Sequence, residues 1–461
     1  MQKGLSFVTF VISAATTLSA AVLLQGDPVH ACGGCFAPPN IVQTVTDHRM
    51  VLSVSAQQTT LWDQFSYTGN PENFSWILPV RSGPNVQLNL ADDRFLTALD
   101  NLTAPQVIRP QPPAACQGGI FLAGAARNTI EESDRRAPPG AVQVFREEVV
   151  GPYAIAVIGG NDPAAIRMWL TDNGFAVPPS VVPVINYYVS IRSDFLALKL
   201  RAGASINRMN PVRVTMPGYA PTLPLRMVSA GVSDKVALNL IVLGTTRFQA
   251  ANFPNAELRD SDLSWNWQAV PLQDPVTDFR AAQRRLYDQN AGNVWLTESA
   301  IRQSNATLQG VAQRARNFPS RNGQPATAVC PPPEMMQGMN CVEPTPEADM
   351  AVALVGLEGA GENIVVTRLR AELPSAFLDR DLQLTPSTNS DLRPTTYRYG
   401  VIVNPPRVPV CDNPGPSRLP VTPLQCSAIP GVRAQLPMSV AVLLGACSAL
   451  FAARRSRASR R

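Results

Sequence analysis

Cys32-Gly33-Gly34-Cys35 is the motif with the most obvious chemistry in the sequence. Two cysteines separated by two residues form the reactive unit of thiol–disulfide exchange proteins, in which one thiol has a lowered pKa. Such a pair is normally followed by a helix N-terminus, whereas Phe36-Ala37-Pro38-Pro39 does not favour a helix. We therefore expect Cys32 and Cys35 to form structural bridges, with Cys116 as a further partner. Redox exchange and metal binding stay open as alternatives, although no second C-x-x-C completes a zinc site.

Histidine chemistry is almost excluded, because the chain contains only His30 and His48. A multi-histidine metal site or an H-E-x-x-H zinc motif needs more than one histidine outside the N-terminal segment. A Ser-His-Asp triad would have to use His48, and there is no G-x-S-x-G motif. His48 stands between Asp47 and Arg49 at the start of a strand, where we expect an exposed or capping role. The sequence thus assigns no catalytic, cofactor-binding or metal-binding residue.

Carboxylates occur in closely spaced pairs, which could serve a hydrolase, a lyase or a calcium site. The pairs are Asp92-Asp93, Glu131-Glu132, Glu147-Glu148, Asp260 with Asp262, and Asp379 with Asp381. Neighbouring acids are more often solvated, so solvation is our expectation for most of them. If a carboxylate enzyme is present, Asp379 and Asp381 are its candidate residues.

The two ends of the chain have the composition of targeting segments. Residues 1–31 contain Lys3, a long apolar run and a small residue at the end, which predicts a cleaved signal peptide. An uncleaved anchor and lipidation of Cys32 remain alternatives. Residues 436–453 carry no charge and precede an arginine cluster at 454–461, which predicts a transmembrane or sorting helix with a cytoplasmic end. We expect an exported, membrane-anchored protein with its domain on the periplasmic or extracellular side.

The domain between these segments has no net charge. The whole chain has a net charge of +5, and five arginines of the C-terminal cluster account for it. Residues 32–435 are therefore neutral, which argues against nucleic-acid binding. With 45% apolar and 16% charged residues, the chain can form a large core. We divide it into an ectodomain at 32–403, with a Pro/Gly-rich loop at about 317–350, and a proline-rich stalk at 404–435.

Cysteine spacing supports export to an oxidising compartment. Seven cysteines lie outside the apolar tail, so one thiol stays free if the others pair. Cys330 and Cys341 flank a short turn-rich segment, and Cys411 and Cys426 flank another. We predict the local disulfides Cys330–Cys341 and Cys411–Cys426.

The hydrophobic pattern of the ectodomain predicts an α+β fold, rich in strands with a few packed helices. Helices are expected after Asp92, after Asn161 or Asp162, and after Asp274. Gly174 should end the second of these helices, with Phe175 closing over Leu170 and Trp169 anchoring the core. The predicted strands are Arg49–Ala56, Thr59–Tyr67, Phe74–Leu78, Tyr153–Ile158, Phe195–Leu200, Val212–Met216, Leu223–Ser229, Val236–Leu243, Val352–Leu357 and Asn363–Leu369. The first three are expected to form a meander, and the last two a hairpin.

Several segments together resemble a known bacterial family. They are Val149–Ile158, Asp162–Phe175, Cys32–Phe36, Phe74–Val80, Phe195–Leu200, Pro224–Met227 and Leu378–Leu382. Spread in this way over most of the ectodomain, they resemble the bacterial domain-of-unknown-function family 2330. The resemblance implies an exported envelope protein and supplies no catalytic residue.

Three functions follow as hypotheses. The favoured one is a non-enzymatic envelope module that binds a protein or glycan partner and uses no cofactor. The alternatives are a carboxylate-dependent hydrolase or lyase, and a thiol–disulfide protein that uses Cys32 and Cys35.

Overall fold

A computed structural model describes the larger part of the chain. The described residues are 35–36, 48–64, 74–111, 142–175, 177–201, 210–229, 232, 234–269, 272–320 and 344–406. They belong to the first of two compact units, Met1–Val408; the second unit, Pro409–Arg461, lies outside them. The predicted signal peptide, apolar C-terminal helix and both predicted local disulfides also fall outside them. Within the described ranges, no helix is long and apolar enough to cross a bilayer.

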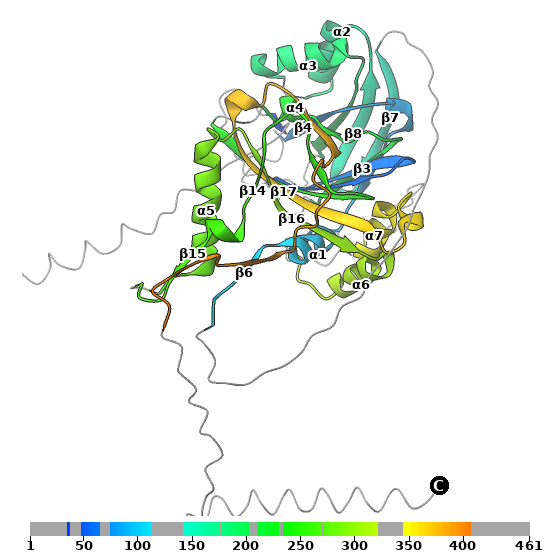
Figure 1. Cartoon of the computed structure of the whole chain (residues 1–461). Coiled ribbons are helices and arrows are strands. Elements are labelled where there is room, and N and C mark those ends of the chain that lie inside the picture. Colours follow the sequence, from blue (N-terminus) through cyan, green and yellow to red (C-terminus); the bar gives the residue numbers. More distant parts are fainter. Residues whose placement is uncertain are drawn as a thin grey trace, which may run out of the picture. The chain divides into compact units, whose positions relative to one another are not determined.

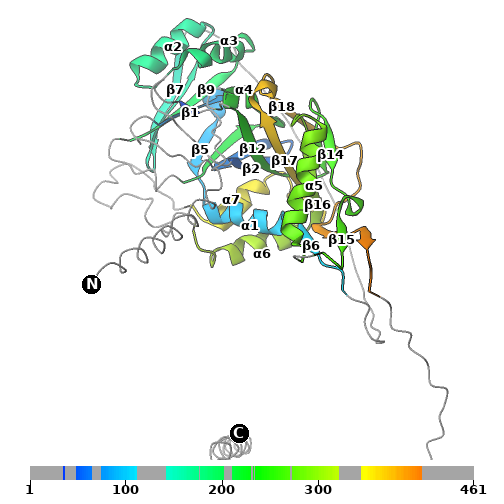
Figure 2. The same cartoon turned by 90° about the vertical axis from the view of Figure 1, so that its left-hand side faces the viewer.

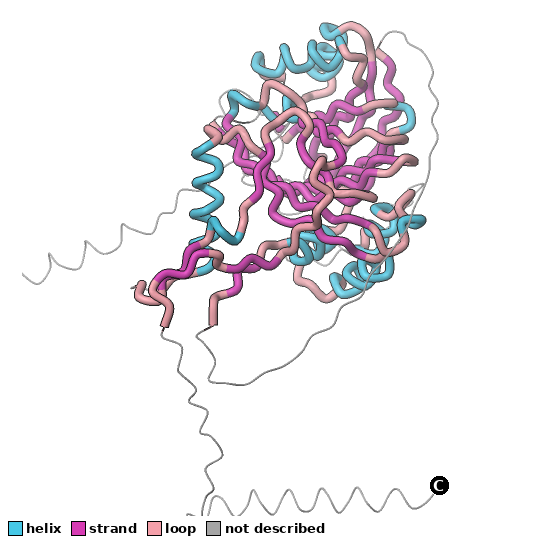
Figure 3. The backbone as a smooth tube through the Cα atoms, in the orientation of Figure 1, coloured by secondary structure: helices cyan, strands magenta, loops and turns pink. Residues whose placement is uncertain are grey.

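Two β-sheets and two groups of helices form a layered α+β structure (Figures 1 and 3). The larger sheet has eight strands in the order β14 (Asn255–Glu257), β16 (Trp295–Gln303), β17 (Ile364–Pro374), β12 (Lys235–Gly244), β2 (His48–Val54), β3 (Gln58–Gln64), β10 (Val212–Pro217) and β5 (Gln87–Leu90). The smaller sheet has five, in the order β1 (Cys35–Phe36), β4 (Ser75–Val80), β9 (Asp194–Leu200), β8 (Tyr153–Gly159) and β7 (Gln143–Val150). The prediction of a strand-rich α+β fold is confirmed.

The main core lies between the two sheets. Alternate residues of each strand point inward, as the two-residue period of a strand requires. Met50, Leu52 and Leu240 of the larger sheet pack in one cluster with Trp76 and Leu198 of the smaller sheet. The shared cluster makes the two sheets one folded unit.

Helices cover the outer face of each sheet (Figure 2). The outer face of the smaller sheet is covered by α2 (Pro163–Asp172) and α3 (Val182–Ser190). The larger sheet carries α1 (Asp93–Thr103), α6 (Asn305–Ala315) and α7 (Pro346–Ala353). The helix α5 (Pro275–Gln289) packs near β16, next to the edge strand β14 of the same sheet.

Small elements complete the fold around α5 and between the sheets. They are a three-stranded sheet of β11 (Thr222–Leu223), β18 (Leu382–Pro386) and β13 (Phe248–Ala250), the pairs β15 (Ser264–Asn266) with β20 (Val401–Val403) and β19 (Thr396–Arg398) with β6 (Gln106–Ile108), and the short helix α4 (Leu225–Ser229). Aromatic side chains of β15 and β19 pack against Phe279 of α5 in one cluster. This cluster fixes the N-terminal half of α5.

The helix boundaries follow the local signals in the sequence. Asp92, Asp162 and Asp274 each accept a hydrogen bond from a backbone N–H of the first helical turn, as predicted. At the end of α2, Gly174 has a φ of +77°, and the N–H of Phe175 donates to the carbonyl of Leu170 at 2.8 Å. This is the predicted Schellman end. Trp169 is only partly buried and stacks on Phe175, so it packs at the edge of the core and does not anchor it.

Three strand predictions were wrong. The meander fails because β4 pairs with β1 and β9 in the smaller sheet, while β3 pairs with β2 and β10. Leu223–Ser229 is mostly helical, since α4 begins directly after Pro224, whose fixed φ suits the start of a helix.

Val352–Leu357 is not the first strand of a hairpin, because it overlaps the end of α7. The Thr345 hydroxyl accepts from the Ala348 N–H, and Pro346 occupies the first turn. The Pro/Gly-rich loop predicted at 317–350 therefore ends several residues earlier than expected. Within the predicted hairpin, only the second strand is confirmed, as part of β17.

Candidate ligand-binding site

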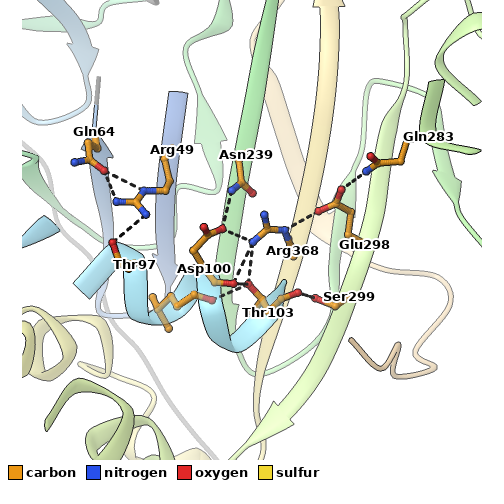
Figure 4. Close-up of polar contacts among 11 residues, drawn as sticks. Arg49, Gln64, Thr97, Asp100, Thr103, Asn239, Gln283, Glu298, Ser299 and Arg368 are labelled. Carbon is orange, nitrogen blue, oxygen red and sulfur yellow. Dashed lines mark hydrogen bonds and ion pairs between the residues drawn. The ribbon is translucent and has the colours of Figure 1, made fainter. Parts of the chain in front are cut away.

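A row of polar side chains crosses the outer face of the eight-stranded sheet (Figure 4). Gln64, Arg49 and Asn239 occupy directly paired positions on β3, β2 and β12. Arg368 of β17 and Glu298 of β16 continue the row toward the sheet edge. These five residues are at most 7% exposed, so each must find its polar partner inside the protein.

Arg368 is the cationic centre of this row. Its Nε donates to Oε2 of Glu298 at 2.6 Å, and its NH1 group donates to Oδ1 of Asp100, on α1, at 2.5 Å. Asp100 also accepts from Nδ2 of Asn239 at 3.1 Å, and Oε1 of Glu298 accepts from Gln283 of α5. The Arg368 guanidinium therefore connects β17 to α1 and to β16, and Glu298 extends this connection to α5.

The pKa shifts in this cluster show that ion pairing outweighs burial. Burial alone would lower the pKa of Arg368, but the charges of Glu298 and Asp100 raise it overall. Burial alone would raise the pKa of Asp100, but the charge and hydrogen bond of Arg368 hold it below its ordinary value. Both groups therefore stay ionised at neutral pH.

At the other end of the row, Arg49 donates hydrogen bonds to two uncharged side chains. Its Nε donates to Oε1 of Gln64 at 3.0 Å, and its NH1 group donates to Oγ1 of Thr97 at 3.1 Å. Thr97 lies one turn before Asp100 on α1, so one face of α1 covers the middle of the row. This half of the row joins the helix to the sheet.

A cavity of about 540 Å³ opens at the β16–β17 end of the row, beneath α5. Its floor is formed by side chains of β16 and β17, namely Glu298, Arg368, Arg370 and Glu372. Its roof is one face of α5, whose contributing residues are Pro275, Val276, Phe279, Arg280, Gln283, Arg284 and Tyr287. The wall beside the start of α5 is made by Pro105, Gln106 and Val107. The size is within the range of about 300–1,000 Å³ typical of small-molecule sites.

The carboxylates that line the cavity have cationic partners, whereas most of the arginines that line it have no carboxylate partner among the described residues. Both carboxylates are engaged, since Glu298 binds Arg368 and Glu372 lies 3.1 Å from Nζ of Lys235. Among the residues that the structure describes, no carboxylate pairs with Arg280, Arg284 or Arg370, and the side chain of Arg370 lies against the Tyr287 hydroxyl. The cavity therefore has an excess of positive charge.

Tyr287 adds a buried polar atom to the same cavity. The residue is 5% exposed, and within the described part of the chain its hydroxyl has no hydrogen bond of normal geometry, although Arg370 lies near it. Burial, and then the charge of Glu298, raise the pKa of this phenol. Tyr287 therefore stays protonated and can donate a hydrogen bond to a ligand.

His48, the histidine expected to be exposed or capping, is instead buried. It is 1% exposed on the inner face of β2, and its Nδ1 lies 3.2 Å from Oδ1 of Asp63. The prediction was wrong because the polar neighbours Asp47 and Arg49 suggested an exposed strand end. The two-residue period of β2 places position 48 on the same side as Met50 and Leu52.

The predicted carboxylate pair does not form a site. Oδ1 of Asp381 accepts from the hydroxyl of Tyr188 at 2.5 Å and from the N–H of Arg226 at 3.1 Å, which ties β18 to α3 and α4. Asp379 is exposed and pairs with Arg380. The two carboxylates therefore have separate structural contacts.

Of the cysteines singled out in the sequence, only Cys35 is described, as the start of β1 opposite Trp76. Cys32, Cys116, Cys330, Cys341, Cys411 and Cys426 lie outside the described ranges. Among the residues that can be described, no three His, Cys, Asp or Glu side chains gather as metal ligands.

Sequence reasoning missed the residues of the cavity, although a signal was present. Arg368, Arg370 and Glu372 alternate with Leu369, Ala371 and Leu373 along β17. Such alternation in a strand means one apolar and one polar face. The predicted strand Asn363–Leu369 ends before most of this alternation, and the burial of the charged face beneath α5 depends on an element that is distant in the sequence.

The fold and the cavity define a sheet-rich α+β protein with a ligand-sized, arginine-lined pocket beneath one helix. The chain belongs to domain-of-unknown-function family 2330, described as an uncharacterised protein conserved in bacteria, whose model matches residues 28–314. The resemblance inferred from the sequence is thereby confirmed. The match includes α5 and β16, whereas β17 lies beyond it. No curated protein and no solved structure matches the chain.

Proposed function

We propose that this protein is an exported, membrane-anchored envelope protein whose ectodomain is a non-enzymatic binding module, and that its ligand occupies the cavity beneath α5. The observation that carries the proposal is the cavity itself, which combines ligand size with three arginines that no carboxylate of the described residues neutralises and a buried tyrosine hydroxyl that has no hydrogen bond of normal geometry there. Buried polar groups left without partners cost free energy, so they commonly mark places where a ligand supplies the missing contacts.

The location rests on the two terminal segments of the sequence. The apolar run at 1–31 favours export, and the uncharged stretch at 436–453 with its following arginines favours a membrane anchor. The local disulfides Cys330–Cys341 and Cys411–Cys426 belong to the same proposal, because an exported chain meets oxidising conditions. Non-reducing peptide mapping of the protein from its own host would test the termini and the disulfides together.

A binding module is favoured over both enzymatic alternatives. Asp381 is occupied by Tyr188 and Arg226, while Asp379 is exposed beside Arg380. Neither is placed to act with the other on a substrate. Cys35 begins a strand, so the helix N-terminus that lowers a thiol pKa in exchange proteins does not start at this residue.

The experiment compares the native protein with a variant whose cavity is filled. Full-length protein would be purified from its own host and analysed by native mass spectrometry for a bound small molecule. Val276→Trp places a large ring at the cavity wall, and because Val276 is 56% exposed, the fold should tolerate it. Val144→Trp is the matched control, on β7 of the other sheet and 44% exposed.

We expect a small molecule to remain bound to the native protein and to the Val144→Trp control, and to be lost from Val276→Trp. A bound molecule retained equally by all three proteins would place the ligand elsewhere. Absence of any retained molecule, together with capture of one envelope protein or polymer by crosslinking, would show that the partner does not use the cavity.

A further inference from the structure

We infer that the cavity beneath α5 is built for an amphiphilic organic anion, with its acidic group at the Arg370 end and its apolar body toward β6. This inference rests on the proposed function and adds the chemical class and the orientation of the ligand.

The acidic group is assigned by the donors at one end of the cavity. Arg370 is half-buried on the floor, and Tyr287 stands near it on the last turns of α5. Both groups donate hydrogen bonds, and the raised pKa of the phenol keeps its proton in place at neutral pH. A carboxylate, phosphate or sulfonate oxygen would accept from both and would satisfy the buried Tyr287 hydroxyl.

The sign of the ligand charge follows from the arrangement of ion pairs. Glu298 is neutralised by Arg368, and Glu372 by Lys235, so neither attracts a cation strongly. Arg280 and Arg284 lie one turn apart on α5, exposed at the cavity, and add positive charge where a ligand enters. A cation would meet three arginines that no carboxylate of the described residues neutralises, so the charge of the lining favours an anion.

The apolar body is assigned by the opposite end. Val276 and Phe279 near the start of α5 line the cavity together with Pro105, which precedes β6, and Val107 of β6. Helical spacing places Val276, Phe279, Gln283 and Tyr287 in one row along α5, and this row changes from apolar to polar along the helix, while Arg280 and Arg284 beside it are exposed. A ligand with an acidic group at one end matches this gradient in a single orientation.

The test uses four small probes titrated calorimetrically into the full-length protein: phenylphosphate, benzoate, benzyl alcohol and inorganic phosphate. Phenylphosphate and benzoate carry an acidic group on an apolar ring, benzyl alcohol lacks the charge, and inorganic phosphate lacks the ring. We expect the better aryl acid to bind at least about tenfold more tightly than benzyl alcohol and than inorganic phosphate. The ranking of phenylphosphate against benzoate then identifies the acidic group that the site prefers.

Variants connect this binding to named side chains. Arg370→Gln should weaken binding of the aryl acid roughly ten- to a hundredfold, because a charge-assisted hydrogen bond is lost. The double variant Arg280→Gln/Arg284→Gln should weaken it less and should reduce its salt dependence, since both side chains are exposed. Arg302→Gln, an exposed arginine on β16 outside the cavity lining, is the matched control and should bind as the native protein does.

Three kinds of failure are distinguishable. If benzyl alcohol binds as tightly as the aryl acids and Val276→Trp abolishes its binding, the cavity binds ligands but the inference of an anion is wrong. If an aryl acid binds and neither arginine variant differs from Arg302→Gln, the assigned orientation is wrong. If no aryl acid binds at concentrations up to about 10 mM and no small molecule copurifies, the inference and the proposed function both fail.

Discussion

Replacement of Arg368 by methionine should destabilise the protein strongly, and a second replacement should restore part of the loss. Arg368→Met removes the only cation that contacts Glu298 in the described structure, and the Glu298 side chain is 4% exposed. Breaking a buried ion pair from one side costs about 3–5 kcal/mol. Asp100 adds little to this figure, because its side chain is 28% exposed and keeps its hydrogen bond from Asn239.

The double variant Arg368→Met/Glu298→Met removes both charges together. An apolar pair of similar volume is often as stable as a buried ion pair, but the amide of Gln283 then loses its acceptor at a cost of about 1–3 kcal/mol. The double variant should therefore lose about 1–3 kcal/mol, less than the single variant. Simple addition of two damaging core changes would predict the opposite order.

Urea unfolding at neutral pH, followed by tryptophan fluorescence, measures these differences in the free energy of unfolding. Arg380→Met is the control, since its ion pair with Asp379 is exposed and should contribute less than about 1 kcal/mol. A single variant within 1 kcal/mol of the native protein, or a double variant less stable than the single one, would refute the reasoning.

Three further predictions concern other contacts. Burial alone would raise the pKa of Asp100, but Arg368 holds this pKa below 3.8. The ionised carboxylate therefore stabilises the protein above about pH 4, and this contribution is lost at lower pH. Asp100→Asn should flatten that part of the acid-unfolding curve. Tyr188→Phe removes the 2.5 Å hydrogen bond to Asp381 and should lower the free energy of urea unfolding by about 1.5–3 kcal/mol, and an unchanged midpoint would contradict this bond. Gly174→Ala should lower the free energy of thermal unfolding by about 1–2 kcal/mol, because φ is +77° at this residue. The added Cβ would contact only Nζ of Lys199, at 3.5 Å, so crowding is small. A much larger loss would mean that crowding, and not backbone strain, dominates.

The parts of the fold that the sequence predicted are those with local causes. The start of α5 at Asp274-Pro275 and the end of α2 at Gly174 each depend on contacts within one helical turn. The strands β2, β8 and β12 were found because their apolar runs are long and bounded by turn residues. Such signals are visible without knowledge of the neighbouring element.

The candidate site could not be predicted because its parts are distant in the sequence. Asp100, Glu298 and Arg368 come from three elements that only the sheet order brings together. The same applies to β4, whose place in the second sheet depends on pairing with β9. Local periodicity identifies a strand and its two faces, but not the strand beside it or the helix above it.

The position of β17 has a consequence for how the protein must be made. This strand lies between β12 and β16, and β12 in turn pairs in parallel with β2 near the start of the chain. The central sheet can close only after residue 374 has been synthesised, so folding is dominated by distant contacts and is expected to be slow. A fragment cut after residue 314, where the family match ends, would leave the edges of β12 and β16 unpaired and prone to aggregation. For this protein, the boundary of the family match is not the boundary of a folding unit.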